Sequence, residues 1–216
     1  MTRDDTRLLV LAKEPVPGNV KTRLSPPCTQ DEATAIARAA LLDTLDTALT
    51  LGLRTVLVLN GDPGSWVPPG IEVLPQRGRG LDERLAAAFE DAGAPGMLVG
   101  MDTPQMTPAL LSGAVDSLWD VGTDGVLGRA EDGGWWCIGL RRADPRVFLG
   151  VPMGTSFTGA VQLRRLRALG LRCTELPRLR DVDDFEDAVA VTATIPGSRF
   201  ASAVLPIADR LESVPR

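Results

Sequence analysis

An apolar run near the N-terminus most constrains what this chain can fold into. Leu8 to Ala12 are all apolar, which is typical of a strand that is buried on both faces. Strands of this kind belong to parallel sheets that helices cover on both sides. Similar short runs recur later in the chain, and amphipathic stretches separate them. The sequence therefore predicts an α/β fold with a mostly parallel sheet flanked by helices.

Strands and helices are predicted to alternate along the whole chain. The strands are expected at about 8–12, 54–59, 71–74, 96–100, 125–127, 135–140 and 171–175. The helices are expected at about 30–51, 81–92, 108–119 and 156–169, then after 183 and from about 197, where a frayed tail follows. No repeat or long linker divides these elements, so residues 1–216 are expected to form a single domain.

Three residues carry helix-start signals. Thr29 opens a capping box, with a glutamate three residues later. Thr107 precedes a proline at the first helical position. Asp183, also followed by a glutamate three residues on, is predicted to cap the helix after the last strand.

The overall composition is that of an ordinary soluble protein. Of 216 residues, 44% are hydrophobic and 24% are charged, and the formal net charge is -5. A negative net charge argues against sequence-independent binding to nucleic acid. The sequence shows no signal peptide and no apolar stretch of the ~20 residues that a membrane span needs, so a cytoplasmic location without membrane partners is expected.

Two residue types are absent, which excludes several mechanisms. The chain has no histidine and no tyrosine, so Ser-His-Asp and Cys-His nucleophiles and His-ligated zinc are excluded. Its three cysteines form no C-x-x-C pair, which suits a reducing compartment. Acid–base or metal chemistry must therefore use carboxylates, lysine, arginine, hydroxyl groups or the substrate itself.

The loop after the first strand is rich in cations. Lys13 ends the strand, and Lys21 and Arg23 close a loop that contains two prolines and Gly18. In an open α/β sheet, ligands bind outside the carboxyl ends of the strands. Lysine and arginine at that edge favour a phosphate site over a solvated basic turn. The loop matches neither the Walker pattern nor G-x-G-x-x-G.

Asp102 follows the strand 96–100 and is expected at the same edge of the sheet. A carboxylate opposite phosphates is repulsive unless a divalent cation lies between them, and Mg²⁺ and Mn²⁺ prefer oxygen ligands. Asp102 is therefore predicted to bind a metal. The competing structural role, capping the next helix, suits Thr107 better.

A second acidic turn joins two later strands. It contains Asp132, Gly133 and Gly134, and the glycines permit a close backbone approach. Of Trp135 and Trp136, one should face the core while the other is free to line a pocket. A plain hairpin turn with two core tryptophans remains the alternative.

Two further segments are candidates for the site. If Asp183 caps a helix, Asp181 is left to orient Lys13 or Lys21, or to join the ligands of the metal. Thr155 and Ser156 lie in a small-residue loop before a helix, where a phosphate or an acceptor can bind. A simple Ser/Thr helix cap is the stronger interpretation of that loop.

Five motifs in this order carry a resemblance to a known family: AKEPVPGNVKTRL, QRGRGLDERL, VGMDTPQMTP, AEDGGWWCIGL and RDVDDFED. From about Leu8 to Ala188 the chain resembles the DUF2064 family, whose members are often labelled glycosyltransferase-like or radical-SAM/selenodomain-associated transferase 1. That family belongs to the nucleotide-diphospho-sugar transferase superfamily, which has the GT-A (Rossmann-like) fold. Met153 and Arg129 depart from the family pattern, standing where a tryptophan and a proline are common.

The resemblance implies nucleotide recognition by the first loop and a metal-binding acid at Asp102. Together with the residues described above, it predicts a transferase that depends on Mg²⁺ or Mn²⁺. Its catalytic residues would be Asp102, Asp132 and Lys21, with Asp132 as acceptor base or outer metal ligand, and its metal ligands Asp102 and Asp181. The nucleotide would be bound by Ala12, Lys13, Gly18, Lys21, Arg23, Gln76 and Arg84. The acceptor pocket would be formed by Gly133, Gly134, Trp135, Thr155 and Ser156.

Three functions are compatible with these features. The labels of the family favour glycosyl transfer from a nucleotide sugar to a small-molecule acceptor. The cation-rich loop and the small size favour nucleotidyl transfer, in which a phosphorylated or carboxylate substrate displaces pyrophosphate from a nucleoside triphosphate. The third is a non-catalytic nucleotide-binding module. The sequence is also compatible with an oligomer.

Overall fold

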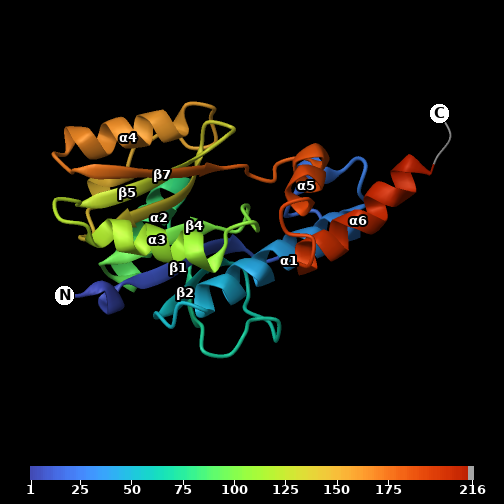
Figure 1. Cartoon of the computed structure of the whole chain (residues 1–216), viewed down its shortest axis with the longest axis horizontal. Helices are drawn as coiled ribbons and strands as arrows, with labels where there is room; N and C mark the ends of the chain where they lie inside the picture. Colours follow the sequence, from blue (N-terminus) through green and yellow to red (C-terminus); the bar gives the residue numbers. More distant parts are fainter. Residues whose placement is uncertain (214–216) are drawn as a thin grey trace.

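A seven-stranded sheet in the order β3-β2-β1-β4-β6-β5-β7 forms the centre of the computed structural model, which describes residues 1–213 (Figure 1). The strands are β1 (Arg7–Lys13), β2 (Thr55–Asn60), β3 (Glu72–Pro75), β4 (Gly96–Gly100), β5 (Gly125–Ala130), β6 (Trp135–Leu140) and β7 (Cys173–Leu179). Neighbouring strands are parallel except where β6 runs antiparallel to both β4 and β5. The predicted α/β fold with a mixed, mostly parallel sheet is confirmed.

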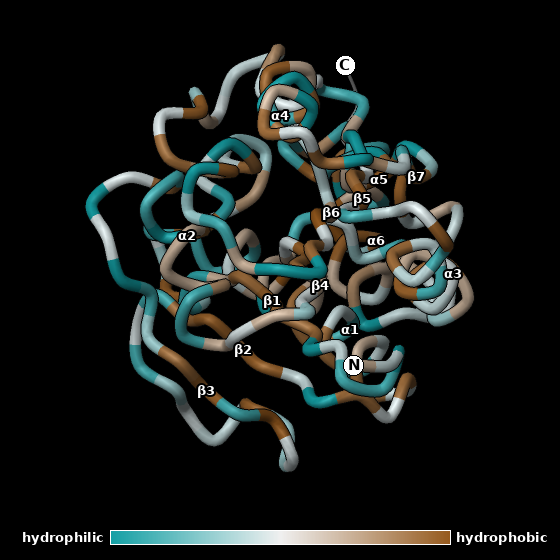
Figure 2. The backbone as a smooth tube through the Cα atoms, turned by 90° about the vertical axis from the view of Figure 1, so that its left-hand side faces the viewer, coloured by the Kyte–Doolittle hydropathy of each residue, from teal (hydrophilic) through white to brown (hydrophobic). Residues whose placement is uncertain are grey.

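Helices cover both faces of the sheet. They are α1 (Gln30–Leu49), α2 (Leu81–Ala92), α3 (Pro108–Trp119), α4 (Thr158–Ala168), α5 (Phe185–Thr192) and α6 (Arg199–Glu212). One face packs against α1 and α3, and the other against α2 and α4. Hydrophobic segments lie along the strands between these layers (Figure 2). None of the helices in residues 1–213 has the length and hydrophobicity needed to cross a membrane.

The first strand shows why the sheet forms where it does. Leu8, Leu9 and Val10 are at most 1% exposed, although successive side chains point to opposite faces. Leu8 and Val10 pack in the core under α1 and α3, and Leu9 packs in the core under α2 and α4. The uninterrupted apolar run in the sequence therefore reflects burial on both faces.

A third hydrophobic core lies beside the sheet, where α5 and α6 pack against α1 (Figure 1). Helix α1 joins this core to the sheet. Its Ala33 and Ile36 are buried with α5 and α6, and its Leu41 and Leu45 are buried in the core of the sheet. Its N-terminus is the predicted capping box, in which the Thr29 side chain accepts from the third helical residue. A single helix therefore supports both cores.

The structure corrects the predicted cap of α5. The N-cap is Asp184, whose side chain accepts a hydrogen bond from the backbone N–H of Asp187, and not Asp183. Asp183 lies one residue earlier, where its carboxylate pairs with Arg23 at 3.1 Å. The run of acidic residues hid which one is the cap. The caps predicted at Thr29 and Thr107 are confirmed.

Other boundaries also differ from the prediction. Strand β5 continues to Ala130, beyond the predicted 125–127. Helix α4 begins at Thr158 with Phe157 at the N-cap, so no serine or threonine caps it. The Thr158 hydroxyl instead donates to the Pro152 carbonyl at 2.8 Å. Strand β7 runs from Cys173 to Leu179, beyond the predicted 171–175, because it pairs with β5 across an irregularity in the register. The tail expected at the C-terminus extends into 214–216, outside the described residues.

Candidate functional site

A cavity of about 710 Å³ opens at the carboxyl ends of β1 and β4. This is the edge of an open α/β sheet where ligands bind, and the volume is in the range of small-molecule sites. Most of the residues predicted for the site line the cavity. They are Ala12, Lys13, Lys21, Arg23, Gln76, Arg84, Asp102, Asp132, Gly134, Trp135, Thr155, Ser156 and Asp181.

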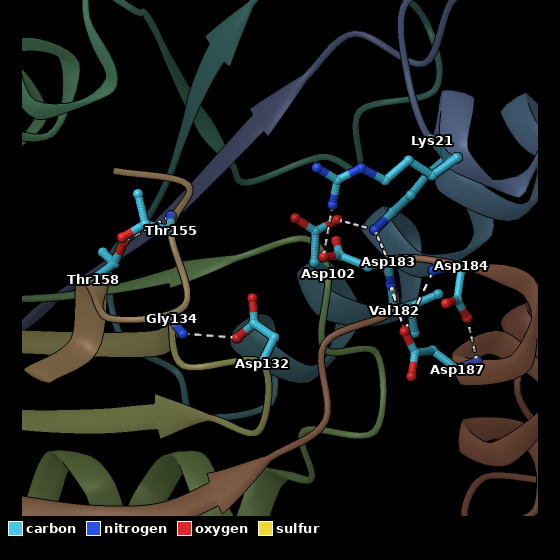
Figure 3. A network of polar contacts seen from close by, with 11 residues as sticks. Lys21, Asp102, Asp132, Gly134, Thr155, Thr158, Val182, Asp183, Asp184 and Asp187 are labelled. Carbon is cyan, nitrogen blue, oxygen red and sulfur yellow. Dashed lines mark hydrogen bonds and ion pairs between the residues drawn. The ribbon is translucent and has the colours of Figure 1, made fainter. Parts of the chain in front are cut away.

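Lys21 is held tightly at the bottom of the first loop. Its side chain is only 9% exposed, forms an ion pair with Asp102 and donates to the Val182 carbonyl (Figure 3). Its φ is +48°, and it is the only non-glycine residue with a positive φ within residues 1–213. A left-handed conformation costs a side-chain-bearing residue about 1–2 kcal/mol. Strain of this kind, held in place by specific contacts, points to a functional position.

The segment after β7 is fixed to the loop after β4. The Val182 N–H donates to the Asp102 carbonyl at 2.9 Å. The Gln105 amide donates to the Arg180 carbonyl at 2.6 Å. Asp181 lies between these two bonds in the sequence, so its position relative to Asp102 is set by the backbone.

Asp181 has a buried carboxylate oxygen. Its Oδ1 atom forms no hydrogen bond with any of residues 1–213. Burial raises the pKa of Asp181 to about 8, and the negative charges of Asp102 and Asp132 add to this effect, while Lys21 opposes it. Burial also raises the pKa of Asp183. The acidic side of the cavity is therefore not fully compensated by the cations of the protein.

The acidic residues fit a divalent cation that is bound partly by the protein and partly by a phosphate group of the ligand. Within residues 1–213, no three acidic side chains converge to form a complete metal site. A nucleotide-bound Mg²⁺ usually takes only one or two carboxylates, and phosphates and waters complete its shell. Asp102 and Asp181 supply that number, and the unpartnered Oδ1 of Asp181 is a hard oxygen donor of the type required.

Two further cations face the cavity. Lys13 is exposed and lies on the same side of β1 as Leu11, because alternate residues of a strand share a face. Arg84 of α2 donates to the Gly78 carbonyl at 3.3 Å. In the described part of the chain neither forms an ion pair, whereas Lys21 and Arg23 both do. Lys13 and Arg84 are therefore available to an anionic ligand without loss of an ion pair.

Gln76 and Gly18 serve the backbone. The Gln76 side-chain amide donates to the carbonyls of Ala12 at 2.8 Å and Val58 at 3.0 Å, so it ties the ends of β1 and β2 together. The side-chain oxygen of Gln76 takes part in neither contact. Gly18 does not line the cavity, and its φ of +81° shows that it shapes the turn of the first loop.

The hairpin turn between β5 and β6 is packed against the loop that precedes α4. A Cβ atom at Gly133 would lie 1.8 Å from the carbonyl oxygen of Ser156, and the φ of Gly133 is +94°. The Gly133 carbonyl accepts from the Gly159 N–H at 2.8 Å. Gly133 is therefore required for packing and does not line the cavity. Asp132 accepts from the Gly134 N–H at 2.8 Å (Figure 3).

The two tryptophans of β6 have different surroundings, because successive side chains of a strand point to opposite faces of the sheet. Trp136 is buried, and its ring nitrogen donates to the Pro177 carbonyl at 3.0 Å. Trp135 is half-buried and lines the cavity. The alternative of two core tryptophans is therefore incorrect.

Several apolar residues of the cavity were not predicted from the sequence. Leu81 and Leu85 of α2 line it together with Leu98 and Met153. The spacing of Leu81 and Leu85 places both on one face of the helix. This pattern was visible in the sequence, but it is equally typical of residues buried in the core.

Comparison with known proteins identifies the family. The sequence model described as "Uncharacterized protein conserved in bacteria (DUF2064)" matches residues 37–155, more than half of the chain. The chain belongs to the DUF2064 family. No curated protein matches this DUF2064 chain.

Solved structures show that the DUF2064 chain has a nucleotide-diphospho-sugar transferase-like fold. A Desulfovibrio desulfuricans G20 protein, provisionally described as a nucleotide-diphospho-sugar transferase, is 26% identical with a TM-score of 0.84, over 97% of this chain and 96% of that one. CMP:2-keto-3-deoxy-manno-octonic acid synthetase complexed with CTP is 12% identical, with a TM-score of 0.58. The match covers 89% of this chain and 98% of the synthetase chain. Rv0371c from Mycobacterium tuberculosis H37Rv, in complex with manganese, is 23% identical, with a TM-score of 0.52. The match covers 88% of this chain and 98% of the Rv0371c chain.

Proposed function

We propose that this DUF2064 protein is a metal-dependent glycosyltransferase that transfers a sugar from a nucleotide-sugar donor to a small-molecule acceptor. One observation carries the proposal. The cavity gathers cations of the first loop and carboxylates of three other loops, and one carboxylate oxygen, Oδ1 of Asp181, is buried without a partner. An anionic ligand that binds together with a metal cation would balance both the positive and the negative charges of such a site. A nucleoside diphosphate carrying Mg²⁺ or Mn²⁺ supplies both.

The cations divide between two tasks. Lys13 and Arg84 hold phosphate oxygens directly, since neither has an ionic partner within the described residues. When the nucleotide binds, the ammonium group of Lys21 leaves the Asp102 carboxylate and contacts a phosphate oxygen instead. Asp102 is then free to bind the metal. A divalent cation held by Asp102 and Asp181 would neutralise charge on the departing diphosphate.

Asp132 is the candidate base. It is exposed at the cavity, and within the described part of the chain its only hydrogen bond is the one that Oδ1 accepts from the Gly134 N–H. In the transfer, the acceptor oxygen bonds to the anomeric carbon, the bond from that carbon to the diphosphate breaks, and the acceptor proton passes to Asp132. The nucleoside diphosphate leaves with the bonding electron pair.

Nucleotidyl transfer is the second candidate, and a specific observation favours it. The end of β1 and the loop after it contribute Lys13, Lys21 and Arg23 to the cavity, a number of cations that suits a triphosphate. The fold is also shared with a synthetase solved with CTP. In this reaction a phosphate or carboxylate oxygen of the acceptor attacks the α-phosphorus, and pyrophosphate leaves.

A thermal-shift panel separates the candidates. Nucleotide sugars and nucleoside triphosphates are tested with and without Mn²⁺, because a ligand that binds the native state raises Tm by mass action. A metal-dependent shift selective for one nucleotide sugar supports glycosyl transfer, and product analysis with that donor then tests turnover. Selectivity for one triphosphate supports nucleotidyl transfer. Binding without metal and without turnover supports a non-catalytic module, and the absence of any shift contradicts nucleotide binding.

A further inference from the structure

One wall of the cavity is apolar and takes no part in the chemistry proposed above. It consists of Leu81 and Leu85 of α2, Leu98 of β4, Trp135 of β6 and Met153 of the loop before α4, and we call these residues the apolar wall. Leu85 and Leu98 belong to the hydrophobic core on that face of the sheet, and Trp135 and Met153 pack against the same core. The apolar wall is therefore a preformed edge of the core.

The apolar wall continues to the surface at Leu81. This residue is 43% exposed although it lines the cavity. The next residue, Asp82, accepts a hydrogen bond from the Gly150 N–H at 2.9 Å, and the neighbouring Leu149 is 42% exposed. Two exposed leucines thus flank one hydrogen bond at the start of α2. A single exposed leucine needs no explanation, but Leu81 extends the apolar lining of a cavity to the surface, and apolar lining of this kind is typical of a binding site.

Two polar groups that line the cavity with this wall are already engaged within the protein. The Thr158 hydroxyl accepts from the Thr155 N–H at 3.1 Å and donates to the Pro152 carbonyl. The Oδ1 atom of Asp132 accepts from Gly134. A polyhydroxylated acceptor placed here would leave hydroxyl groups against apolar side chains, and an unpaired polar group in such surroundings is costly.

We propose that the acceptor of this transferase has an apolar body, a short alkyl chain or a ring, that lies on the apolar wall. Its reacting hydroxyl or phosphate group lies at the acidic side of the cavity beside Asp132. Trp135 follows the turn that holds Asp132, so the apolar body and the reacting group are adjacent in the same cavity. This inference rests on the proposed function, because it assigns the acceptor of that same transfer.

Isothermal titration with three phosphates, each in the presence of Mn²⁺, tests the inference. Hexyl phosphate, inorganic phosphate and glucose 1-phosphate share the head group and differ in the body attached to it. We expect hexyl phosphate to bind at least tenfold tighter than the other two, since burial of about two methylene groups is sufficient for that ratio. Equal affinity for hexyl and inorganic phosphate, or tighter binding of glucose 1-phosphate, overturns the inference.

Matched variants locate the binding. Leu81→Ser should reduce the preference for hexyl phosphate at least threefold, and Met153→Ser is a second variant of the same wall. The control is Leu205→Ser, which alters a leucine of similar exposure (41%) on α6 and away from the cavity, and it should retain the full preference. If Leu81→Ser and Met153→Ser both keep the preference, the alkyl chain binds elsewhere and the inference is wrong.

The nucleotide response of the unchanged protein separates this inference from the function on which it rests. A metal-dependent Tm shift with a nucleotide, without any preference for hexyl phosphate, overturns the acceptor assignment alone. A preference for hexyl phosphate, when no nucleotide shifts the Tm of the protein, overturns the proposed transferase and the acceptor assignment together.

Discussion

The ammonium group of Lys21 and the carboxylate of Asp102 form an ion pair that closes the acidic side of the cavity (Figure 3). The two residues come from the loops after β1 and β4, which are adjacent parallel strands. Lys21 also holds the Val182 carbonyl, so one cation connects three segments of the chain. The pair places a positive charge against the carboxylate that we assign to the metal.

Asp102→Asn should abolish metal-dependent nucleotide binding. The amide keeps the shape of the side chain but removes the charge that holds the cation, and the loss of affinity should exceed about 100-fold, since even outer ligands of metal sites are worth 10–100-fold. The measurement is the nucleotide-induced Tm shift with and without Mn²⁺. Asp116→Asn, which breaks only the exposed ion pair with Arg3, is the control. An unchanged Mn²⁺ response in Asp102→Asn would remove this residue from the metal site.

Lys21→Met should have opposite effects on the metal and on the nucleotide. Loss of the ammonium frees Asp102, so Mn²⁺ alone should bind more tightly, while nucleotide binding should weaken because a phosphate contact is lost. Titration calorimetry with Mn²⁺ and then with the nucleotide measures both. Mn²⁺ affinity equal to or lower than that of the unchanged protein would show that Lys21 does not compete with the cation.

Asp181 should make the protein less stable as the pH rises in the absence of metal. The folded protein keeps the Asp181 proton up to a pKa of about 8, whereas the unfolded chain releases it near 3.8. Unfolding therefore releases a proton between these values, and the free energy of unfolding falls as the pH increases through this window. Urea denaturation at pH 5 and pH 8 measures the effect.

Asp181→Asn should flatten this pH dependence and raise the stability at pH 8. Asp209→Asn, an exposed aspartate on α6, is the control and should leave the dependence unchanged. The same slope in Asp181→Asn and in the unchanged protein would mean that another group carries the effect.

Gly133→Ala should be strongly destabilising. The added Cβ atom would lie 1.8 Å from the Ser156 carbonyl oxygen, so the backbone must move in addition to the strain at positive φ. Gly154→Ala provides the comparison, since its φ is +70° and nothing lies within 4 Å of its added Cβ. We expect about 1–2 kcal/mol for Gly154→Ala and at least about 2 kcal/mol more for Gly133→Ala. Similar costs in urea denaturation would contradict the packing role of Gly133.

Local signals in the sequence were sufficient for the order and type of the elements. Helix α2 and strand β6 have the predicted bounds, because each is framed by glycines or a turn and has a clear hydrophobic pattern. The cap of α5 was wrong because Asp183 and Asp184 are chemically equal caps, and only the long-range partner Arg23 distinguishes them.

The sequence predicted most of the polar residues that line the cavity, but neither its apolar residues nor its contacts. The rule that ligands bind at the carboxyl ends of parallel strands placed Lys13 and Asp102 together. No local pattern indicates that Lys21 adopts a left-handed conformation, or that the amide of Gln76 is occupied by the Ala12 carbonyl. These features depend on segments that meet only in the folded chain.

Helix α1 couples the core under α5 and α6 to the core of the sheet. Because Ile36 and Leu41 lie on the same helix but in different cores, unfolding of the α5–α6 region would remove the support of the first turns of α1 and of the loop that carries Lys21. Loss of order far from the cavity would thus reach the loop that carries Lys21 before it reached the sheet. In hydrogen exchange, the amides of α5, α6 and the first half of α1 should then open as one cooperative unit.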